Sequence, residues 1–266
     1  MTVSPAAVDH LQPACAALER STPLLVEVMR RAPAGVRPAK MRWTNGEIAA
    51  HMYASVTEGT KLLRGEPSMY DVELSAELDE RMVAQVTERE PAVLAGLVEQ
   101  RTAEFLSVAR GRSGSDPVDA PRGTVGAFVG LLALDHHLHG GQFADTAGAA
   151  WTGRVADLHA PLSVVVPYAF DPEAARGFTG SYSLQLRGVQ PVRYGVRDGQ
   201  LQMDLTGPTD CTISTDTQTF LRLGIGVLSQ ARAALTGKMR PGGRKPWLAF
   251  KVDTLFPAIP HGGVAR

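Results

Sequence analysis

The stretch LLALDHHLHGGQFAD, residues 131–145, decides how the rest of the chain is interpreted. Apolar residues at helical spacing lead into it, and the same helix face continues through Asp135, His139 and Phe143. A carboxyl group and an imidazole therefore lie one turn apart on the expected buried side of a helix. A buried carboxylate needs a paired charge, hydrogen bonds or a metal ion. The stretch predicts either part of a divalent metal site or a core Asp–His pair without a metal.

Two more histidines, His136 and His137, lie in the same stretch. On a helix they point away from the face that carries Asp135, so we do not expect them to be ligands. The spacing of His136 and His139, i and i+3, leaves an alternative ligand pair open.

A third ligand can come from WTNGEIAAHM, residues 43–52. Thr44 and Glu47 have the spacing of a capping box, which predicts a helix that begins near Asn45. His51 borders the apolar side of this helix. The residues alone leave two interpretations of His51, a metal ligand or a core histidine whose hydrogen bonds are satisfied.

The two stretches together carry a resemblance to a known family. A helix that opens with Trp-Thr and carries a histidine near its second turn, followed about 85 residues later by an acidic residue, three spacers and a histidine, resembles the DinB-like metalloproteins. Within that fold the chain is most similar to the mycothiol-dependent maleylpyruvate isomerase family. The resemblance implies a zinc site with a catalytic role at His51, Asp135 and His139, with aspartate where the family has glutamate. It also implies mycothiol as the thiol co-substrate.

The apolar pattern divides the chain into two parts. Helical spacing predicts helices over 5–32, 45–64, 75–90, 92–110 and 124–147, and long helices with short loops make an up-and-down bundle. After Ala150 a linker and a short apolar helix are followed by a period of two. Asp198-Gly199 between two alternating runs predicts a β-hairpin. A strand over 210–216, helices over 217–224 and 228–236 and a last strand within 246–256 are expected to follow.

The second part resembles the sterol-carrier-protein fold in its hairpin, in DCTISTDTQTFLRL and in LTGKMRPGG. We therefore expect an α+β two-domain protein. A DinB-like four-helix bundle with the metal site occupies residues 1–149, and a sterol-carrier-like domain with a mainly antiparallel sheet occupies residues 154–266.

Arginines are the candidate substrate contacts. Arg81, in the third helix, could bind an anion, and a solvated surface charge is the alternative. The resemblance places an active-site arginine where this chain has Gly226-Val227, so a contact of the relatives is missing. Arg222 or Arg232 could take its place.

Composition limits the partners. Lys and Arg number 27, as do Asp and Glu, so no net charge favours nucleic acid or an anionic membrane. No apolar run approaches the ~20 residues of a membrane helix, and the first residues lack the pattern of a signal peptide. Cys15 and Cys211 form no CxxC motif and are expected to be reduced thiols of a cytoplasmic protein. We expect small-molecule partners and a monomer or a homodimer.

Together these features predict a function. Two imidazoles and one carboxylate leave one zinc position open, as in catalytic sites, and zinc deprotonates a bound thiol. We expect a mycothiol-dependent thiol transferase or exchange enzyme that acts on a small electrophile or S-conjugate, in natural-product biosynthesis or detoxification. The alternatives are mycothiol-dependent maleylpyruvate isomerisation and a non-catalytic protein that binds a lipid or another small molecule.

Overall fold

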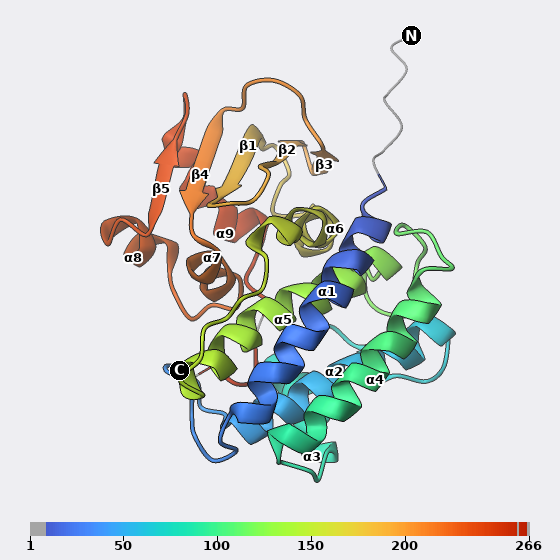
Figure 1. Ribbon diagram of the computed structural model, residues 1–266. Helices are drawn as coiled ribbons and strands as arrows, with labels where there is room; N and C mark the ends of the chain where they lie inside the picture. The colour runs from blue at the N-terminus through green and yellow to red at the C-terminus, as the bar shows by residue number, and fades with distance from the viewer. Residues whose placement is uncertain (1–8, 260, 265–266) are drawn as a thin grey trace.

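A helical region is followed by a five-stranded sheet with short helices in the computed structural model, which describes residues 9–259 and 261–264 (Figure 1). The first region contains α1 (Leu11–Arg31), α2 (Asn45–Arg64), η1 (Met69–Asp71), α3 (Ala76–Gln85), α4 (Pro91–Ala109) and α5 (Val125–Thr146). The second contains η2 (Val155–Leu158), α6 (His159–Ala169), β1 (Thr179–Leu186), β2 (Val192–Arg197), β3 (Gln200–Met203), β4 (Cys211–Thr215), α7 (Thr217–Gly224), α8 (Gln230–Leu235), β5 (Met239–Gly242), η3 (Pro246–Lys251) and α9 (Val252–Leu255). The expected α+β fold is confirmed.

Four long helices, α1, α2, α4 and α5, pack into the bundle. Helix α1 lies against α4 and α5, and α2 lies against α4. Fully buried side chains such as Leu25, Ile48 and Leu94 come from three of these helices and share one core cluster. Burying each of these side chains contributes about 1.5–3 kcal/mol to the free energy of folding, and this contribution stabilises the packing of the helices.

The helix ends follow the local sequence. Thr44 and Glu47 form the predicted capping box at the start of α2, and Gly65 ends that helix with a left-handed φ of 72°. Helix α3 ends at Gln85, five residues before the expected end, because the Arg89 side chain bonds the carbonyl groups of Val83 and Val86. The expected first helix covered residues 5–32; residues 5–8 lie outside the described chain, and the helix begins at Leu11.

The sheet has the order β3-β2-β1-β4-β5. Strands β1 and β4 are parallel and the other neighbours are antiparallel, so the sheet is mainly antiparallel as expected. Asp198 and Gly199 form the two-residue turn of the predicted hairpin and connect β2 to β3. Both have a positive φ, 45° and 75°.

The prediction of a last strand within 246–256 is wrong. This segment forms η3 and α9, and Pro246 begins it at a position where a missing N–H costs nothing. The fifth strand is β5, whose Pro241-Gly242 ending concealed it in the sequence. A proline is tolerated there because β5 lies at the edge of the sheet.

Two connections bring the parts of the chain together. Helix α6 packs on α5 and α1 and also contacts β2, so it lies between the bundle and the sheet (Figure 1). Residues 261–264, here named the 261–264 segment, return to the helical region. Arg42 N–H donates to the carbonyl of Gly263 over 2.8 Å, and Met41 forms an isolated bridge with Val264. The chain between α1 and α2 is thereby joined to the far end of the sequence.

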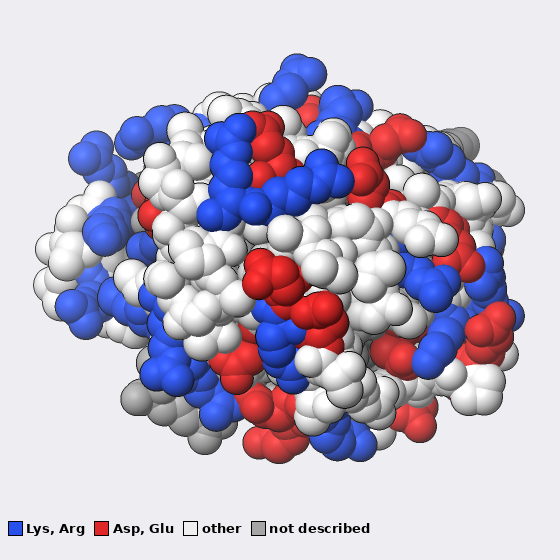
Figure 2. Space-filling model, turned by 60° about the horizontal axis from the view of Figure 1, so that its bottom comes forward, with Lys and Arg blue, Asp and Glu red and all other residues white. Residues whose placement is uncertain are grey.

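Acidic and basic side chains are interspersed over much of the face drawn in Figure 2, in keeping with equal numbers of the two kinds in the sequence. Among the helices that the structure describes, none is both long and apolar enough to span a membrane.

Candidate metal centre and adjoining cavity

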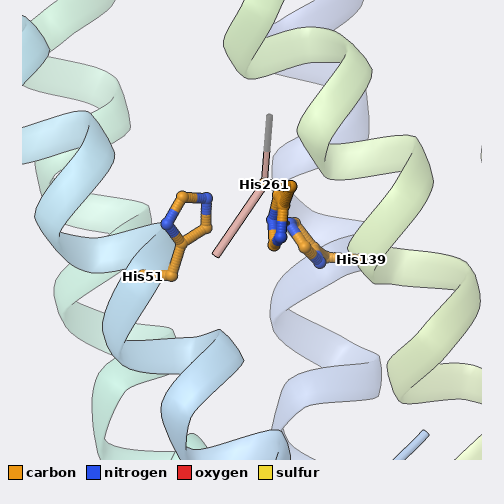
Figure 3. A group of neighbouring side chains, drawn as sticks. All are labelled: His51, His139 and His261. Atoms are coloured by element: carbon orange, nitrogen blue, oxygen red, sulfur yellow. Dashed lines mark hydrogen bonds between the residues drawn. The ribbon is translucent and has the colours of Figure 1, made fainter. Parts of the chain in front are cut away.

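Three histidines from distant parts of the chain meet between the helices. His51 comes from α2, His139 from α5 and His261 from the 261–264 segment (Figure 3). One ring nitrogen of each lies within 4.8 Å of those of the other two, which is close enough for one metal ion. His51 and His139 are buried, with exposed fractions of 4% and 0%. Two of the three predicted ligands, His51 and His139, thus lie together.

Asp135, the third predicted ligand, lies beside this group. Its Oδ2 is 4.0 Å from Nε2 of His51, and its side chain lines the cavity described below. Burial, with a smaller contribution from the nearby Asp79, raises the pKa of Asp135 from 3.8 to about 8. In the absence of a cation this carboxyl group is therefore mostly protonated at neutral pH.

The ring nitrogens of His51 make no hydrogen bond to any described residue, although both are buried. Unpaired buried polar atoms are costly, and a metal ion would satisfy one of them. Burial lowers the pKa of His51 well below 6.5 and that of His139 to about 4. Both imidazoles are therefore neutral at pH 7 and can offer a nitrogen lone pair to a metal ion. The residues present therefore fit a divalent metal ion that accepts nitrogen and carboxylate donors, such as zinc.

A hydrogen bond fixes which nitrogen of His139 is free. Nδ1 lies 2.8 Å from Oε1 of Gln142, which can only accept, so Nδ1 carries the proton. The lone pair on Nε2 then points to the other two histidines. Metal-binding histidines ordinarily donate the N–H of their second ring nitrogen to an oxygen atom, as His139 does to Gln142.

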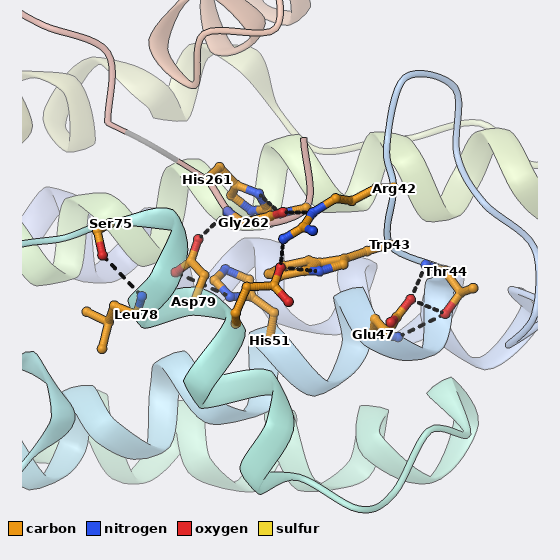
Figure 4. A network of polar contacts seen from close by, with 12 residues as sticks. Arg42, Trp43, Thr44, Glu47, His51, Ser75, Leu78, Asp79, His261 and Gly262 are labelled. Carbon is orange, nitrogen blue, oxygen red and sulfur yellow. Dashed lines mark hydrogen bonds and ion pairs between the residues drawn. The ribbon is translucent and has the colours of Figure 1, made fainter. Parts of the chain in front are cut away.

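Asp79 of α3 joins two parts of the site and was missed in the sequence. Its Oδ1 lies 3.8 Å from Nδ1 of His51, and its Oδ2 accepts a hydrogen bond of 2.9 Å from Gly262 N–H (Figure 4). Burial raises its pKa from 3.8 to about 7. The signal in the sequence was a carboxylate three residues before the buried Met82, the same kind of signal that identified Asp135.

Trp43 packs against two of the histidines. Its ring centroid lies 5.3 Å from that of His51 and 5.1 Å from that of His261, and its Nε1–H donates to Glu80 over 2.9 Å. His261 itself could not be found from the sequence, because a single histidine before Gly-Gly gives no indication of which element it contacts.

The two histidines that follow Asp135 have other partners. Nδ1 of His136 lies 3.0 Å from the Ser21 hydroxyl, and Nδ1 of His137 accepts a hydrogen bond of 3.4 Å from Trp151. Neither belongs to the group of three histidines.

A cavity of about 230 Å³ begins at His51, Asp79, Asp135 and His261. It continues between α5, α6 and the sheet, where the lining side chains include Leu131, Leu162, Val166, Leu184, Ile213 and Met239. None of the described residues that line it is Lys or Arg. The cavity thus has a polar end with two carboxyl groups and a long apolar part.

The two arginines singled out in the sequence lie elsewhere. Arg81 is exposed on α3. Arg222 of α7 is half-buried and lines a second hollow of about 280 Å³, together with Gln142 and Val227. The two hollows share Leu138 and Ile225, so they adjoin one another.

Comparisons with known proteins support the fold. No protein-family model matches the sequence, and no curated protein is similar to it in sequence. The structure is similar to the crystal structure of the mycothiol-dependent maleylpyruvate isomerase over 94% of this chain and 96% of that chain, with a TM-score of 0.50 and 14% identity. A histidine-to-alanine variant of a mycothiol-dependent maleylpyruvate isomerase matches with the same coverage, a TM-score of 0.51 and 15% identity. At this identity the likeness shows a shared fold, the one that the sequence motifs indicated.

Proposed function

We propose that this protein is a metal-dependent thiol transferase in which His51, Asp135 and His139 hold a divalent ion, with zinc as the expected ion. The observation that carries the proposal is His51, whose two buried nitrogens have no hydrogen-bond partner among the described residues and lie beside a neutral imidazole and a carboxyl group. Three protein donors with one position left open are typical of catalytic zinc.

The thiol co-substrate that we propose is mycothiol, because the fold is that of an enzyme described as mycothiol-dependent. A bound zinc ion would lower the pKa of a thiol, ordinarily near ~8.5, so that the thiolate is present at neutral pH. The thiol's proton passes to solvent and its sulfur forms a bond to an electrophilic carbon. The electron pair of the displaced bond leaves with the departing group or, in a conjugated acceptor, moves to a neighbouring carbon that takes a proton.

The lining of the cavity favours an uncharged, largely apolar electrophile. A dicarboxylate such as maleylpyruvate would have to enter a space lined by three carboxyl groups, those of Asp79, Asp135 and Asp253, and by no described Lys or Arg side chain. The proposed metal ion could pair with one of its two carboxylates, but burying the other without a partner costs several kcal/mol or more. Isomerisation of maleylpyruvate is therefore the less favoured alternative.

The second hollow suits the polar part of the thiol. It adjoins the cavity, and Gln142, Asp145 and Arg222 line it. Arg222 offers paired donors to sugar or carboxylate oxygens. Replacing Arg222 by Ala should raise the apparent KM for mycothiol and leave kcat nearly unchanged, if the contact is equal in the ground and transition states.

The test measures metal content and thiol-dependent conversion in the same protein samples. Wild type, His51→Ala and the control His159→Ala, which removes an imidazole outside the three-histidine group, are incubated with zinc, mycothiol and 2-nonenal, and the S-conjugate is followed by mass. We expect conversion by wild type and the control, and loss of both metal and conversion in His51→Ala. Equal conversion by all three proteins, or conversion of maleylpyruvate in place of 2-nonenal, would show the proposal to be wrong.

A protein that binds an apolar ligand without turnover is the second candidate, and the long apolar part of the cavity favours it. Binding of 2-nonenal or 1-decanol that does not require metal, with no conversion after mycothiol is added, would support it.

A further inference from the structure

We infer that His261 is not a metal ligand but a hydrogen-bond donor: its Nε2–H faces the lone pair of His139 in the protein alone, and would donate to the sulfur of a bound thiol once a metal ion occupies that lone pair. The inference rests on the proposed function. It assigns a catalytic contact to a residue 210 positions (261 minus 51) after His51, on a segment that packs against the helical region.

The proton on His261 is placed by the backbone. Gly263 N–H donates to Nδ1 of His261 over 3.0 Å, so this nitrogen carries the lone pair. In a neutral imidazole the other nitrogen, Nε2, then carries the proton. Because Nδ1 accepts this hydrogen bond it carries no proton, and the ring is the neutral imidazole.

The direction of that N–H is set by His139. Nε2 of His261 lies 3.4 Å from Nε2 of His139, whose own proton is on Nδ1 because of Gln142. The two assignments agree, since a donor on His261 faces a lone pair on His139. This contact occupies, in the protein alone, the lone pair of His139 that a metal ion would use.

A ligand role for His261 conflicts with the same contacts. The 3.4 Å separation of the two Nε2 atoms would also suit two ligands of one zinc ion, which lie about 3.3 Å apart when each bond is ~2.0–2.1 Å and the geometry is tetrahedral. However, binding through Nε2 would require the proton on Nδ1, where it would face Gly263 N–H. The hydrogen bond to Gly263 therefore favours the donor role.

The 261–264 segment is held closely enough to fix this geometry. Gly262 N–H donates to Asp79, and a Cβ atom at Gly262 would lie 2.9 Å from the Trp43 ring, while one at Gly263 would lie 2.6 Å from it. Only glycine allows the backbone to pack this near to the indole, which is why His-Gly-Gly stands here. His261 is thus carried by backbone contacts to Asp79, Trp43 and the residues before α2.

Two experiments test the inference. The first is metal-free: the ¹⁵N chemical shifts of the imidazoles report which nitrogen carries the proton. We expect the Nε2–H form for His261 and the Nδ1–H form for His139. The opposite form of His261 would overturn the inference whether or not the protein uses a metal.

The second experiment loads cobalt(II) into wild type, His261→Ala, His261→Gln and the control His159→Ala, and adds 2-mercaptoethanol as the probe thiol. We expect His261→Ala to bind cobalt within about threefold of wild type with the same visible spectrum. Its affinity for the thiol, read from the sulfur-to-cobalt absorption band, should fall roughly tenfold, because a hydrogen bond to a charged group is lost. His261→Gln, whose amide can donate, should recover part of it.

The outcomes separate the proposals. Loss of cobalt or a changed spectrum in His261→Ala would make His261 a ligand, and unchanged thiol affinity would remove its role as a donor. Absence of cobalt binding by wild type would refute the proposed function, and the donor role with it, while leaving the tautomer assignment from the first experiment standing.

Discussion

Replacing Asp135 by Asn should stabilise the metal-free protein while it abolishes metal binding. Burial raises the pKa of Asp135 from 3.8 to about 8, so the folded state binds a proton that the unfolded state has lost throughout this pH range. Because the pKa is raised, the protonated carboxyl group of Asp135 leaves the free energy of unfolding undiminished below pH 3.8. Between pH 3.8 and pH 8 the free energy of unfolding falls as the pH rises. Asn has nearly the same shape and no charge, and it removes this loss.

The magnitude follows from linkage. One proton of difference changes the free energy of unfolding by about 1.4 kcal/mol per pH unit, so the loss for wild type reaches at most about 4 kcal/mol at pH 7. The advantage of Asp135→Asn should therefore grow with that slope between about pH 4 and pH 8 and then stop growing.

Urea unfolding of the metal-free proteins at pH 5, 6, 7 and 8 measures the effect, with Asp145→Asn as the control because Asp145 is exposed on the same helix. The buried histidines also make the free energy of unfolding depend on pH, but they lower it as the pH falls. Their effect is the same in every variant, so it cancels when the variants are compared. A difference between wild type and Asp135→Asn that stays constant with pH would refute the reasoning.

Three further outcomes are expected. Zinc binding at pH 7 should release close to one proton from Asp135, and less above pH 9, as measured by calorimetry in buffers of different ionisation enthalpy; release independent of pH would contradict it. Thr44→Ala should lower the free energy of unfolding by about 1 kcal/mol, because the capping hydrogen bond to Glu47 N–H is lost, and no change in the urea midpoint would argue against the cap. Gly140→Ala should cost about 1–3 kcal/mol, because a Cβ atom would overlap the Trp151 ring; a thermal midpoint equal to that of wild type would show that the indole moves aside freely.

Of the candidate-site side chains that lie on helices, the sequence predicted His51, Asp135 and His139 but not Asp79. Asp135 and His139 stand one turn apart on a periodic stretch, and His51 follows a capping box, so local rules were sufficient for their elements. Asp79 was overlooked beside the arginine in the same helix, although the periodicity contained it. His261 lies on no regular element, and only tertiary packing on Trp43 brings it to the site.

The sheet shows the same division. The hairpin at Asp198-Gly199 and strand β4 followed from alternation and turn chemistry. Strand β5 could not be predicted in this way, because its residues include Pro and Gly and have a poor propensity for strands. Only tertiary pairing with β4, at the edge of the sheet, makes this segment a strand. The apolar residues of 246–256 have a pattern too short to separate a strand from helical turns.

The origin of the three histidines has a consequence for the order of events on the ribosome. A chain is synthesised from its N-terminus, and helices α1 to α5 can pack before residues 261–263 leave the exit tunnel. During that interval Asp79 lacks Gly262 as its hydrogen-bond donor, and His139 lacks its contact with His261. The candidate site in the nascent helical region therefore lacks both of these contacts until the last residues of the chain arrive.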